Sequence, residues 1–426
     1  MGSPVRFPCF SASARERLVG AWPPGLPFGN CRRGLLQPVM PDLPLSDRRP
    51  LRAIFVDVPL IYSSGITQVL SKVARYRPKD VLSVFVASLD VPQKSTVELF
   101  ESVDARVEHL GNASILQSAL RLRKLMRSES LDVVVANSFR SYLVGKVATL
   151  FSGTPVVYWI HTINQLKTNP IKNFIFSTLA RHDPLIYVSE AVMVNNRPEG
   201  YRGEDTIIYN SVEPPENNPD WQPYGGQKRR EFGLPEDATV LGYMAHFVYY
   251  KDHATLLHTF DVLAKKFPKL YLLLLGNGPD HDAMVRLASQ LDSSDRILFL
   301  GPRKDARAVL GLVDIYVHVA TEEAFGLAVI EAMLAQRPVV AARAFALPEL
   351  IRDGETGLLF EPRNVQDLAE KVTRLIEDPV YAARLAQAGE EACRRNFPPE
   401  PFARQVTTFL QDVTISRSAR ALLREV

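Results

Sequence analysis

The sequence predicts an α/β protein with two doubly wound parallel-sheet domains. Short apolar runs typical of buried strands alternate with segments whose apolar residues recur at helical spacing, and this alternation occurs twice along the chain. A stretch rich in Pro and Gly at 213–235 separates the two series and is a candidate linker. The length of 426 residues is sufficient for two or three domains, at roughly 100–200 residues per domain.

The first series begins with an apolar run at Leu51–Asp57, which we expect to be a buried strand. Apolar residues at 66, 69, 70 and 73 follow it at the spacing of an amphipathic helix. Further strands of this series are predicted at Val81–Ala87, Val133–Ala136, Pro155–Ile160 and Leu185–Val188.

The second series contains the more regular apolar runs. A helix is expected after Asn364, a favourable N-cap, and one or two helices from about Pro398. The series divides the chain into a first domain at 50–220, a second at 221–397 and C-terminal helices at 398–426 that pack back toward the first domain. Its strands are predicted at Thr239–Met244, Leu270–Leu275, Ile297–Leu300, Ile315–Val319 and Val339–Ala342.

Residues 1–49 show neither period and are expected to be a disordered tail. The formal net charge is +3, and the first 50 residues hold seven Arg, no Lys and three acidic residues, so the positive excess lies in this tail. A near-neutral body argues against a nucleic-acid partner. The spacing of Cys9, Cys31 and Cys393 fits neither a metal site nor a disulfide framework. We therefore expect a reduced, cytoplasmic protein with no bound metal or cofactor.

Motifs that carry chemistry are expected in the loops that follow strands, because ligands of such sheets bind outside the carboxyl ends of the strands. Ser63, Ser64 and Gly65 lie between the first strand and the first helix, where a glycine allows close approach of a ligand. A glycine that merely starts the helix is the favoured explanation of this loop when the loop is taken alone. His246 and Lys251, after Thr239–Met244, are cations suited to a diphosphate, although a packed His and a solvated Lys are the simpler interpretation.

Two further loops follow strands of the second series. Gly276-Asn277-Gly278 permits close backbone approach, and it precedes an Asp280-His281-Asp282 segment. A divalent metal on these two carboxylates is one interpretation, but we prefer an N-cap at Asp280 and a first-turn acid at Asp282.

The most informative motif runs from Glu322 to Met333 after the strand ending at Val319. The N–H groups of residues 325–327 are expected to point out of a helix start toward an anionic leaving group. Glu323 is placed to accept hydrogen bonds from sugar hydroxyls, and Glu331 to bind vicinal ribose hydroxyls. Capping and a solvated helix face are the alternative explanation of the two acids.

At these residues the chain resembles the retaining, nucleotide-sugar-dependent glycosyltransferases of family 4, which have the GT-B fold. The resemblance rests on the Glu-x7-Glu motif at Glu323–Glu331, on Lys251–Leu257, on Gly276–Pro279 and on Pro338–Ala341. It continues through Pro348–Leu359, while the first half matches less closely, at residues 64–65, 161, 188–190 and 209–213. The resemblance implies two Rossmann-like domains with an interdomain cleft, of which the first recognises the acceptor and the second binds the nucleotide-sugar.

The resemblance also implies roles for single residues. The implied catalytic residues are Glu323 at the transferred sugar, His161 near the reacting carbon and Lys251 at the phosphates. The implied donor-binding residues are Gly65, His246, Lys251, Arg303, Phe325, Gly326, Leu327 and Glu331.

The sequence departs from the family pattern at three places. His246 stands where the family usually has Arg, which weakens the diphosphate contacts or makes them sensitive to pH. Ser64-Gly65 and Phe345-Ala346 each replace a usual Gly-Gly. These departures leave open which sugar donor is used, and they bear less on whether a donor binds.

The predicted activity is retaining transfer of a sugar from a UDP- or GDP-sugar to an acceptor hydroxyl of a glycan or lipid-linked acceptor, without a metal. A nucleotide-sugar epimerase and a non-catalytic binding subunit are the alternatives. Basic and apolar residues mix over 166–182, which is typical of a helix that lies on an anionic membrane. A peripheral contact at the inner face of a membrane is therefore one interpretation of this segment, and a core-facing helix is the other.

Overall fold

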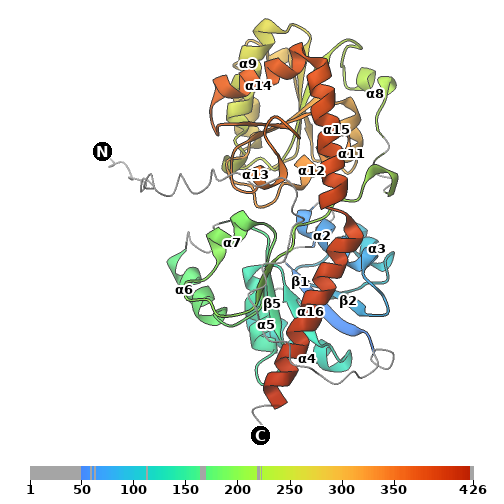
Figure 1. The fold of residues 1–426 in the computed structure, drawn as a ribbon, viewed down its shortest axis with the longest axis vertical. Helices are drawn as coiled ribbons and strands as arrows, with labels where there is room; N and C mark the ends of the chain where they lie inside the picture. The colour runs from blue at the N-terminus through green and yellow to red at the C-terminus, as the bar shows by residue number, and fades with distance from the viewer. Residues whose placement is uncertain are drawn as a thin grey trace, which may run out of the picture. The chain divides into compact units, whose positions relative to one another are not determined.

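The computed structural model describes residues 49–57, 60–61, 64–111, 114–163, 169–217, 221 and 223–422. Residues 49–426 form one compact unit, and Figure 1 shows its helices and strands. The tail expected at 1–49 lies outside the described residues, apart from Arg49, and so do Leu166 and Lys167 of the basic-apolar segment.

The first half of the described chain folds around a seven-stranded parallel sheet with the order β3-β2-β1-β4-β5-β6-β7. Its strands are β1 (Leu51–Asp57), β2 (Leu82–Ser88), β3 (Arg106–His109), β4 (Val133–Ala136), β5 (Val156–Ile160), β6 (Leu185–Tyr187) and β7 (Asp205–Ile207). The helices of this half are α2 (Gly65–Tyr76), α3 (Lys94–Glu101), α4 (Ile115–Ser128), α5 (Phe139–Ala148), α6 (Pro170–Leu179) and α7 (Glu190–Asn196).

The second half of the described chain folds around a six-stranded parallel sheet with the order β10-β9-β8-β11-β12-β13. Its strands are β8 (Thr239–Met244), β9 (Leu270–Leu275), β10 (Ile297–Gly301), β11 (Ile315–His318), β12 (Val339–Ala342) and β13 (Leu358–Phe360). Its helices are α8 (Gly226–Glu231), α9 (His253–Lys266), α10 (His281–Ala288), α11 (Ala306–Val309), α12 (Leu327–Leu334), α13 (Leu347–Leu350), α14 (Val365–Glu377), α15 (Pro379–Asn396) and α16 (Pro399–Leu422).

Both strand orders run outward from the first strand in one direction and then in the other, which is the doubly wound Rossmann-like topology. The prediction of an α/β fold with two such sheets is therefore confirmed. The reason is visible in the strands, because β1 and β4 are apolar and buried along most or all of their length, as expected for strands covered by helices on both faces.

The sequence analysis missed three strands, and all three lie at sheet edges. β3 and β7 are only half-buried or exposed and carry charged residues, so neither has an apolar run that would have marked it. β13 is buried but only three residues long. The expected linker at 213–235 also contains structure, a 3-10 helix at Pro215–Asn217 and helix α8.

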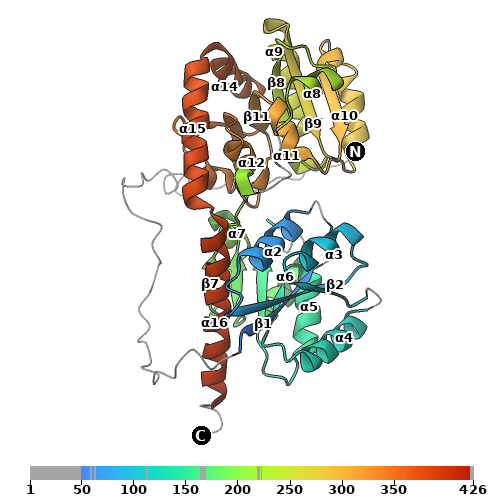
Figure 2. The same cartoon turned by 90° about the vertical axis from the view of Figure 1, so that its right-hand side faces the viewer.

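The C-terminal region is more helical than the sequence indicated. The helix expected after Asn364 is α14, and the Asn364 side chain accepts from the Asp367 N–H at 3.1 Å as an N-cap. Helix α15 follows without having been predicted, whereas α16 is one continuous helix, in agreement with the one or two helices expected from about Pro398. Helix α15 packs against α12, while α16 packs against α2 of the first half, where Figure 2 shows it beside the first sheet.

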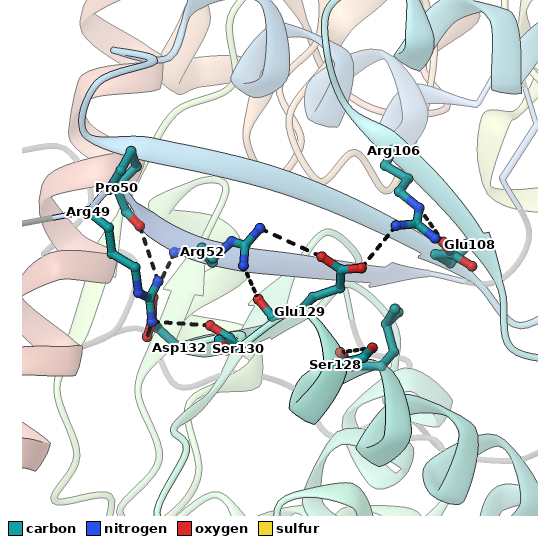
Figure 3. Close-up of polar contacts among 10 residues, drawn as sticks. Arg49, Pro50, Arg52, Arg106, Glu108, Ser128, Glu129, Ser130 and Asp132 are labelled. Atoms are coloured by element: carbon teal, nitrogen blue, oxygen red, sulfur yellow. Dashed lines mark hydrogen bonds and ion pairs between the residues drawn. The ribbon is translucent and has the colours of Figure 1, made fainter.

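The described chain begins with a polar network at the amino end of the first sheet (Figure 3). The Arg49 guanidinium contacts both carboxylate oxygens of Asp132 at 2.8 and 2.9 Å, and the backbone N–H of Arg52 donates to the same carboxylate at 2.8 Å. Glu129 pairs with Arg52 at 3.6 Å and with Arg106 at 2.9 Å. Exposed pairs of this kind stabilise a fold by about 0–1 kcal/mol each, so the network fixes the strand ends rather than driving folding.

None of the helices in the described residues is long and apolar enough to cross a membrane.

Candidate functional site

Most of the residues singled out in the second half lie in loops at the carboxyl ends of β8, β9 and β11, whereas Arg303 follows β10 and Glu331 lies in α12. β8 pairs with both β9 and β11, so the three loops meet at one edge of the sheet. This is the edge at which the topology places a ligand.

Lys251 is held by the loop between β8 and α9. It ends a 3-10 helix that begins at Tyr249, and its carbonyl accepts from the Tyr243 hydroxyl at 2.8 Å. Asp252 then adopts a left-handed conformation at φ 49°, and its carboxylate accepts from the Thr255 hydroxyl at 2.7 Å inside α9. The turn therefore fixes the direction of the Lys251 side chain through its backbone.

The two glycines after β9 bring their loop against the loop after β8. A Cβ on Gly276 would lie 1.9 Å from the carbonyl oxygen of Ala245, and a Cβ on Gly278 would lie 2.3 Å from that of Phe247. The Phe247 N–H also donates to the Asn277 carbonyl at 2.9 Å. The close approach expected of these glycines is thus made to the chain itself, and it supports the loop that carries Lys251.

Lys251 and Glu323 form the central contact of the site. The Lys251 Nζ lies 2.6 Å from Glu323 Oε2, and both side chains are largely buried, with 15% and 13% exposure. Burial alone would raise the pKa of Glu323, but the charge of Lys251 and the hydrogen bond from His318 hold it well below its usual range. Glu323 is therefore a buried carboxylate that stays ionised.

His318, the last residue of β11, is a second partner of Glu323. Its Nε2 lies 2.8 Å from the same Oε2 atom, and the residue is 2% exposed. Burial lowers the pKa of His318 although the carboxylate opposes this shift. The imidazole is therefore neutral and donates to Glu323 through Nε2.

The turn between Glu323 and α12 is shaped by Gly326. This residue is the N-cap at φ 103°, a conformation that favours glycine, and a Cβ there would lie 3.1 Å from a methyl group of Leu350. Within the described chain no hydrogen bond uses the backbone N–H of Phe325, Gly326 or Leu327. These N–H groups at the start of an eight-residue helix are suited to an anion.

Glu331, expected at the ribose, is engaged by a residue that the sequence did not indicate. The Nε and one terminal nitrogen of Arg307 both lie 2.9 Å from Glu331 Oε1. Lys72 of α2 lies in the electrostatic field of this pair. Burial lowers the pKa of Lys72 to about 8; the charge of Arg307 adds to this shift, whereas the charges of Glu213 and Glu331 oppose it. A helix of the first half thus brings a cation within electrostatic range of the expected ribose ligand.

Arg303 and His246 are placed apart from the Lys251–Glu323 contact. Arg303 donates two hydrogen bonds to the Asp305 carboxylate, at 2.8 and 2.6 Å. The bonds from Arg303 and from the Tyr224 hydroxyl lower the pKa of Asp305 to about 2, although its partial burial opposes this shift. His246 is exposed in the loop after β8, and no hydrogen bond or ion pair among the described residues joins it to Glu323.

Two residues from the first sheet belong to the expected site. Gly65 is the first residue of α2, and a Cβ there would lie 3.2 Å from a methyl group of Leu327, so the starts of α2 and α12 are neighbours. His161 follows β5, and its Nε2 lies 3.0 Å from the Asn137 side-chain oxygen. Burial lowers the pKa of His161 to about 3, so the ring is neutral near pH 7.

Hydrogen bonds join two parts of the second half, the turn before α12 and Glu349 of α13, to the first half of the chain. The Ser189 hydroxyl donates to the Ala324 carbonyl at 2.7 Å. The Glu349 carboxylate accepts from the backbone N–H groups of Glu190 and Ala191, at the start of α7, at 2.9 and 2.8 Å, and from the Tyr209 hydroxyl at 2.9 Å. Burial raises the pKa of Glu349 although these bonds oppose the shift.

The structure brings together Glu323 and Lys251, which were singled out from the sequence, and adds neighbours that the sequence analysis did not indicate. His318, Arg307 and Asp305 were not singled out, because each lies outside the motif and pairs with a residue brought near only by folding. His318 had one usable signal, as a polar residue inside an otherwise apolar strand. No group of three metal-ligating side chains is found in the described ranges. Asp280 is the N-cap residue of α10 and Asp282 a first-turn acid, both as expected, although the Asp280 side chain forms no cap hydrogen bond.

Comparison with known proteins shows which family and which relatives the chain resembles. Residues 226–392 match the family described as glycosyl transferases group 1. N-acetyl-alpha-D-glucosaminyl L-malate synthase of Bacillus anthracis is 24% identical over 313 residues, which cover 70% of this chain and 79% of that protein. The lipopolysaccharide core biosynthesis glycosyltransferase LpsE of Rhizobium meliloti is 31% identical over 172 residues, 40% of this chain and 49% of that protein.

Solved structures share the fold over most of the chain. HepE of Anabaena, in complex with UDP and glucose, superposes with a TM-score of 0.74 at 24% identity and covers 85% of this chain and 99% of its own. Sucrose-phosphate synthase of Thermosynechococcus elongatus superposes with a TM-score of 0.70 at 19% identity, over 87% and 100% of the two chains. The architecture is therefore GT-B.

Proposed function

We propose that this chain, which belongs through residues 226–392 to the glycosyl transferases group 1 family, transfers a sugar from a nucleoside-diphosphate donor to an acceptor hydroxyl. The donor class that we propose is a UDP- or GDP-sugar, and the binding of UDP and glucose by HepE supports it. The acceptor that we propose is a glycan or a lipid-linked glycan.

The observation that carries this proposal is the buried, ionised carboxylate of Glu323 beside Lys251 and the start of α12. A donor brings two chemical groups that need such partners, a diphosphate and a sugar with hydroxyl groups. The N–H groups at 325–327 and the Lys251 ammonium can stabilise charge on the departing diphosphate. The carboxylate of Glu323 can accept a hydrogen bond from a sugar hydroxyl at the same time.

We propose that transfer retains the anomeric configuration by front-face displacement. The departing phosphate then accepts the proton of the acceptor hydroxyl, and the transition state has oxocarbenium character. Glu323 is already engaged by two donors on one oxygen, which suits a hydrogen-bonding partner of the sugar better than a nucleophile. No metal ion is needed in this scheme because Lys251 and the helix start supply positive charge at the phosphates.

The remaining donor contacts follow from the second sheet. Glu331 can bind the ribose hydroxyls through Oε2, since Arg307 occupies Oε1. The backbone near Arg303 is the proposed contact of the nucleobase, with the side chain oriented by Asp305. His246 is exposed in the loop of Lys251 and is proposed as an outer contact of the diphosphate.

The first sheet is the proposed acceptor side. His161 is neutral and oriented by Asn137, so its second ring nitrogen can contact a hydroxyl near the reacting carbon. Gly65 at the start of α2 lets this helix approach Leu327 and the diphosphate.

A lipid-linked acceptor would explain the exposed apolar side chains on two helices of the first half. On α6, Ile171 and Phe174 are 72% and 71% exposed beside the exposed Lys172. On α4, Leu116 and Leu120 are exposed at a helical spacing that continues to basic residues at 124 and 127. Helix α5 contacts both helices, because it packs against α4 and its Tyr142 ring meets Phe176 of α6 at 6.2 Å between centroids. We propose that this basic and apolar surface lies on an anionic membrane.

The donor proposal is tested by a thermal-shift screen of the full chain against UDP-, GDP- and ADP-glucose, followed by measurement of nucleoside diphosphate release. We expect one base class to raise the melting temperature and to be turned over. A shift without turnover under any acceptor would favour a non-catalytic binding subunit, and isomerised donor without an acceptor would favour an epimerase.

The membrane proposal is tested separately by flotation with vesicles of phosphatidylcholine, with and without phosphatidylglycerol. The Ile171→Ser, Phe174→Ser double variant should lose binding to the anionic vesicles, whereas Val380→Ser, at a 79% exposed site on α15, should not. Equal flotation of all variants would contradict the assignment of this surface.

A further inference from the structure

Glu323 receives its two strongest contacts on one oxygen atom. Lys251 Nζ and His318 Nε2 lie 2.6 and 2.8 Å from Oε2. Among the described residues no hydrogen bond reaches the other oxygen, Oε1. The carboxylate therefore has one oxygen bound to the protein and one available to a ligand.

The two partners of Oε2 differ in rigidity. Lys251 reaches Glu323 with a long flexible side chain, and the same ammonium is needed at the phosphates when a donor is bound. His318 is buried on a strand, and its short side chain has few alternative positions. Its other nitrogen, Nδ1, lies 3.5 Å from the Tyr316 hydroxyl, which in turn lies 3.4 Å from both the N–H and the carbonyl of Met244. The imidazole is thus anchored to the strand that leads to Lys251.

We propose that His318 is a positioning residue, which holds Oε2 of Glu323 in place so that Oε1 stays directed at the donor sugar while Lys251 turns to the diphosphate. This inference rests on the proposed function. The physical reason is the cost of an unpaired buried charge, since a carboxylate that lost Lys251 without another donor would move or take up a proton. His318 removes that penalty without touching the substrate.

Two substitutions separate positioning from general packing. His318→Leu keeps an apolar side chain in the strand but removes the Nε2–H donor. His318→Gln places an amide N–H near the position of Nε2. We expect release of nucleoside diphosphate, measured with UDP-, GDP- and ADP-glucose, to fall about 10–100-fold in His318→Leu and to return to within about 3-fold of wild type in His318→Gln, in line with the loss of one oriented hydrogen bond. Similar losses in both variants would overturn the inference.

A double-variant comparison shows whether His318 acts through Glu323. The variant that combines His318→Leu with Glu323→Gln should be no slower than Glu323→Gln alone, because the group that His318 positions is already changed. A further loss of 10-fold or more would mean that His318 acts by another route. If Glu323→Gln itself kept full activity, the proposed function of the site would fail, and the inference with it.

The protonation of His318 supplies a test that needs no donor. Long-range 1H–15N spectra of the full chain labelled at histidine should contain a neutral Nε2–H ring signal at pH 7 that is absent from His318→Gln and shifted in Glu323→Gln. An Nδ1–H tautomer for His318 would contradict the contact, even if the enzyme were fully active.

Discussion

The two halves of the proposed site are built differently. In the second half, Lys251, His318 and Glu323 are joined by hydrogen bonds of 2.6 and 2.8 Å and are largely buried. In the first half, one hydrogen bond to Asn137 orients His161, whose ring also lies 5.1 Å from that of Trp159 between centroids, and Gly65 contributes only a close approach to Leu327. The proposed donor side is therefore formed in advance, whereas the proposed acceptor side offers a few oriented groups.

This difference has a physical reason in the proposed chemistry. Charge that develops on a diphosphate is stabilised best by groups that are already fixed, because moving them during the reaction would cost free energy. An acceptor hydroxyl is neutral and needs mainly correct placement, which the shape of the binding surface supplies. Substitutions in the second half should therefore cost more activity than substitutions in the first.

The largest loss is expected at Glu323. Glu323→Gln removes the charge that faces Lys251 and should lower turnover about 10²–10³-fold, the range seen when one preorganised polar group is lost from an active site. Steady-state release of nucleoside diphosphate measures the effect. Glu322→Gln, one residue earlier in the same loop, is the matched control and should stay near wild type; equal losses in both variants would show that the loop, and not the Glu323 carboxylate, matters.

The next loss is expected at Lys251. Lys251→Met keeps most of the apolar stem but removes the charge, and kcat/KM for the donor should fall about 10–100-fold because the diphosphate loses a point charge. Lys269→Met, on an exposed side chain of the same half, should have no such effect. A Lys251→Met enzyme that uses the donor like wild type would remove this residue from the site.

A smaller loss is expected in the first half. His161→Gln should lower transfer about 10-fold or less, since it changes one oriented neutral group, and should leave the thermal shift caused by the donor unchanged. Asn137→Ala should have a weaker effect of the same kind by freeing the ring. A loss at His161 as large as that at Glu323 would break the contrast between the halves.

The smallest effect concerns stability at low pH and involves the half-buried His161 of the first half and the buried His253 of the second. Burial lowers the pKa of His161 and of His253, where Lys251 adds to the shift, to about 3. The unfolded chain binds these protons below about pH 6.5 and the folded chain does not, so stability falls as the pH drops from about 6.5 toward 3. At pH 5 the loss should be about 1–2 kcal/mol for each histidine.

Urea unfolding at pH 7.5 and pH 5 measures this loss. His253→Leu should reduce the dependence on pH by the share of that histidine, whereas His258→Leu, at an exposed position on α9, should not. A stability that rises on acidification would contradict the neutral state of both rings.

The sequence was informative where local pattern decides structure. The buried strands β1, β4, β8, β9 and β12 were predicted within a residue of their bounds, because apolar runs of this kind suit only a covered parallel strand. The edge strands β3 and β7 could not be recognised, because a strand with one neighbour can carry charged residues. Helix α15 was missed although it is 18 residues long, and no helix was predicted over residues 379–396.

The candidate site divides in the same way. Glu323, Lys251 and Gly326 lie in local motifs and were singled out from the sequence, although the left-handed φ of 103° at Gly326 was not predicted. Arg307 could not be singled out, and His318 offered only the signal of a polar residue in an apolar strand, because both make contacts, to Glu331 and to Glu323, that only the fold creates. The glycines at 276 and 278 were recognised, but the backbone that they approach is that of the chain itself.

The central claim, that Lys251 and Glu323 act together on the donor, is tested most directly by a double-mutant cycle of turnover. Nucleoside diphosphate release is measured for the wild type, Lys251→Met, Glu323→Gln and the double variant. We predict that the double variant is at most about 3-fold slower than Glu323→Gln, less than the loss of about 10–100-fold expected from Lys251→Met alone, because residues that act as a unit are strongly non-additive. Losses that simply multiply, or a double variant with wild-type turnover, would contradict the account.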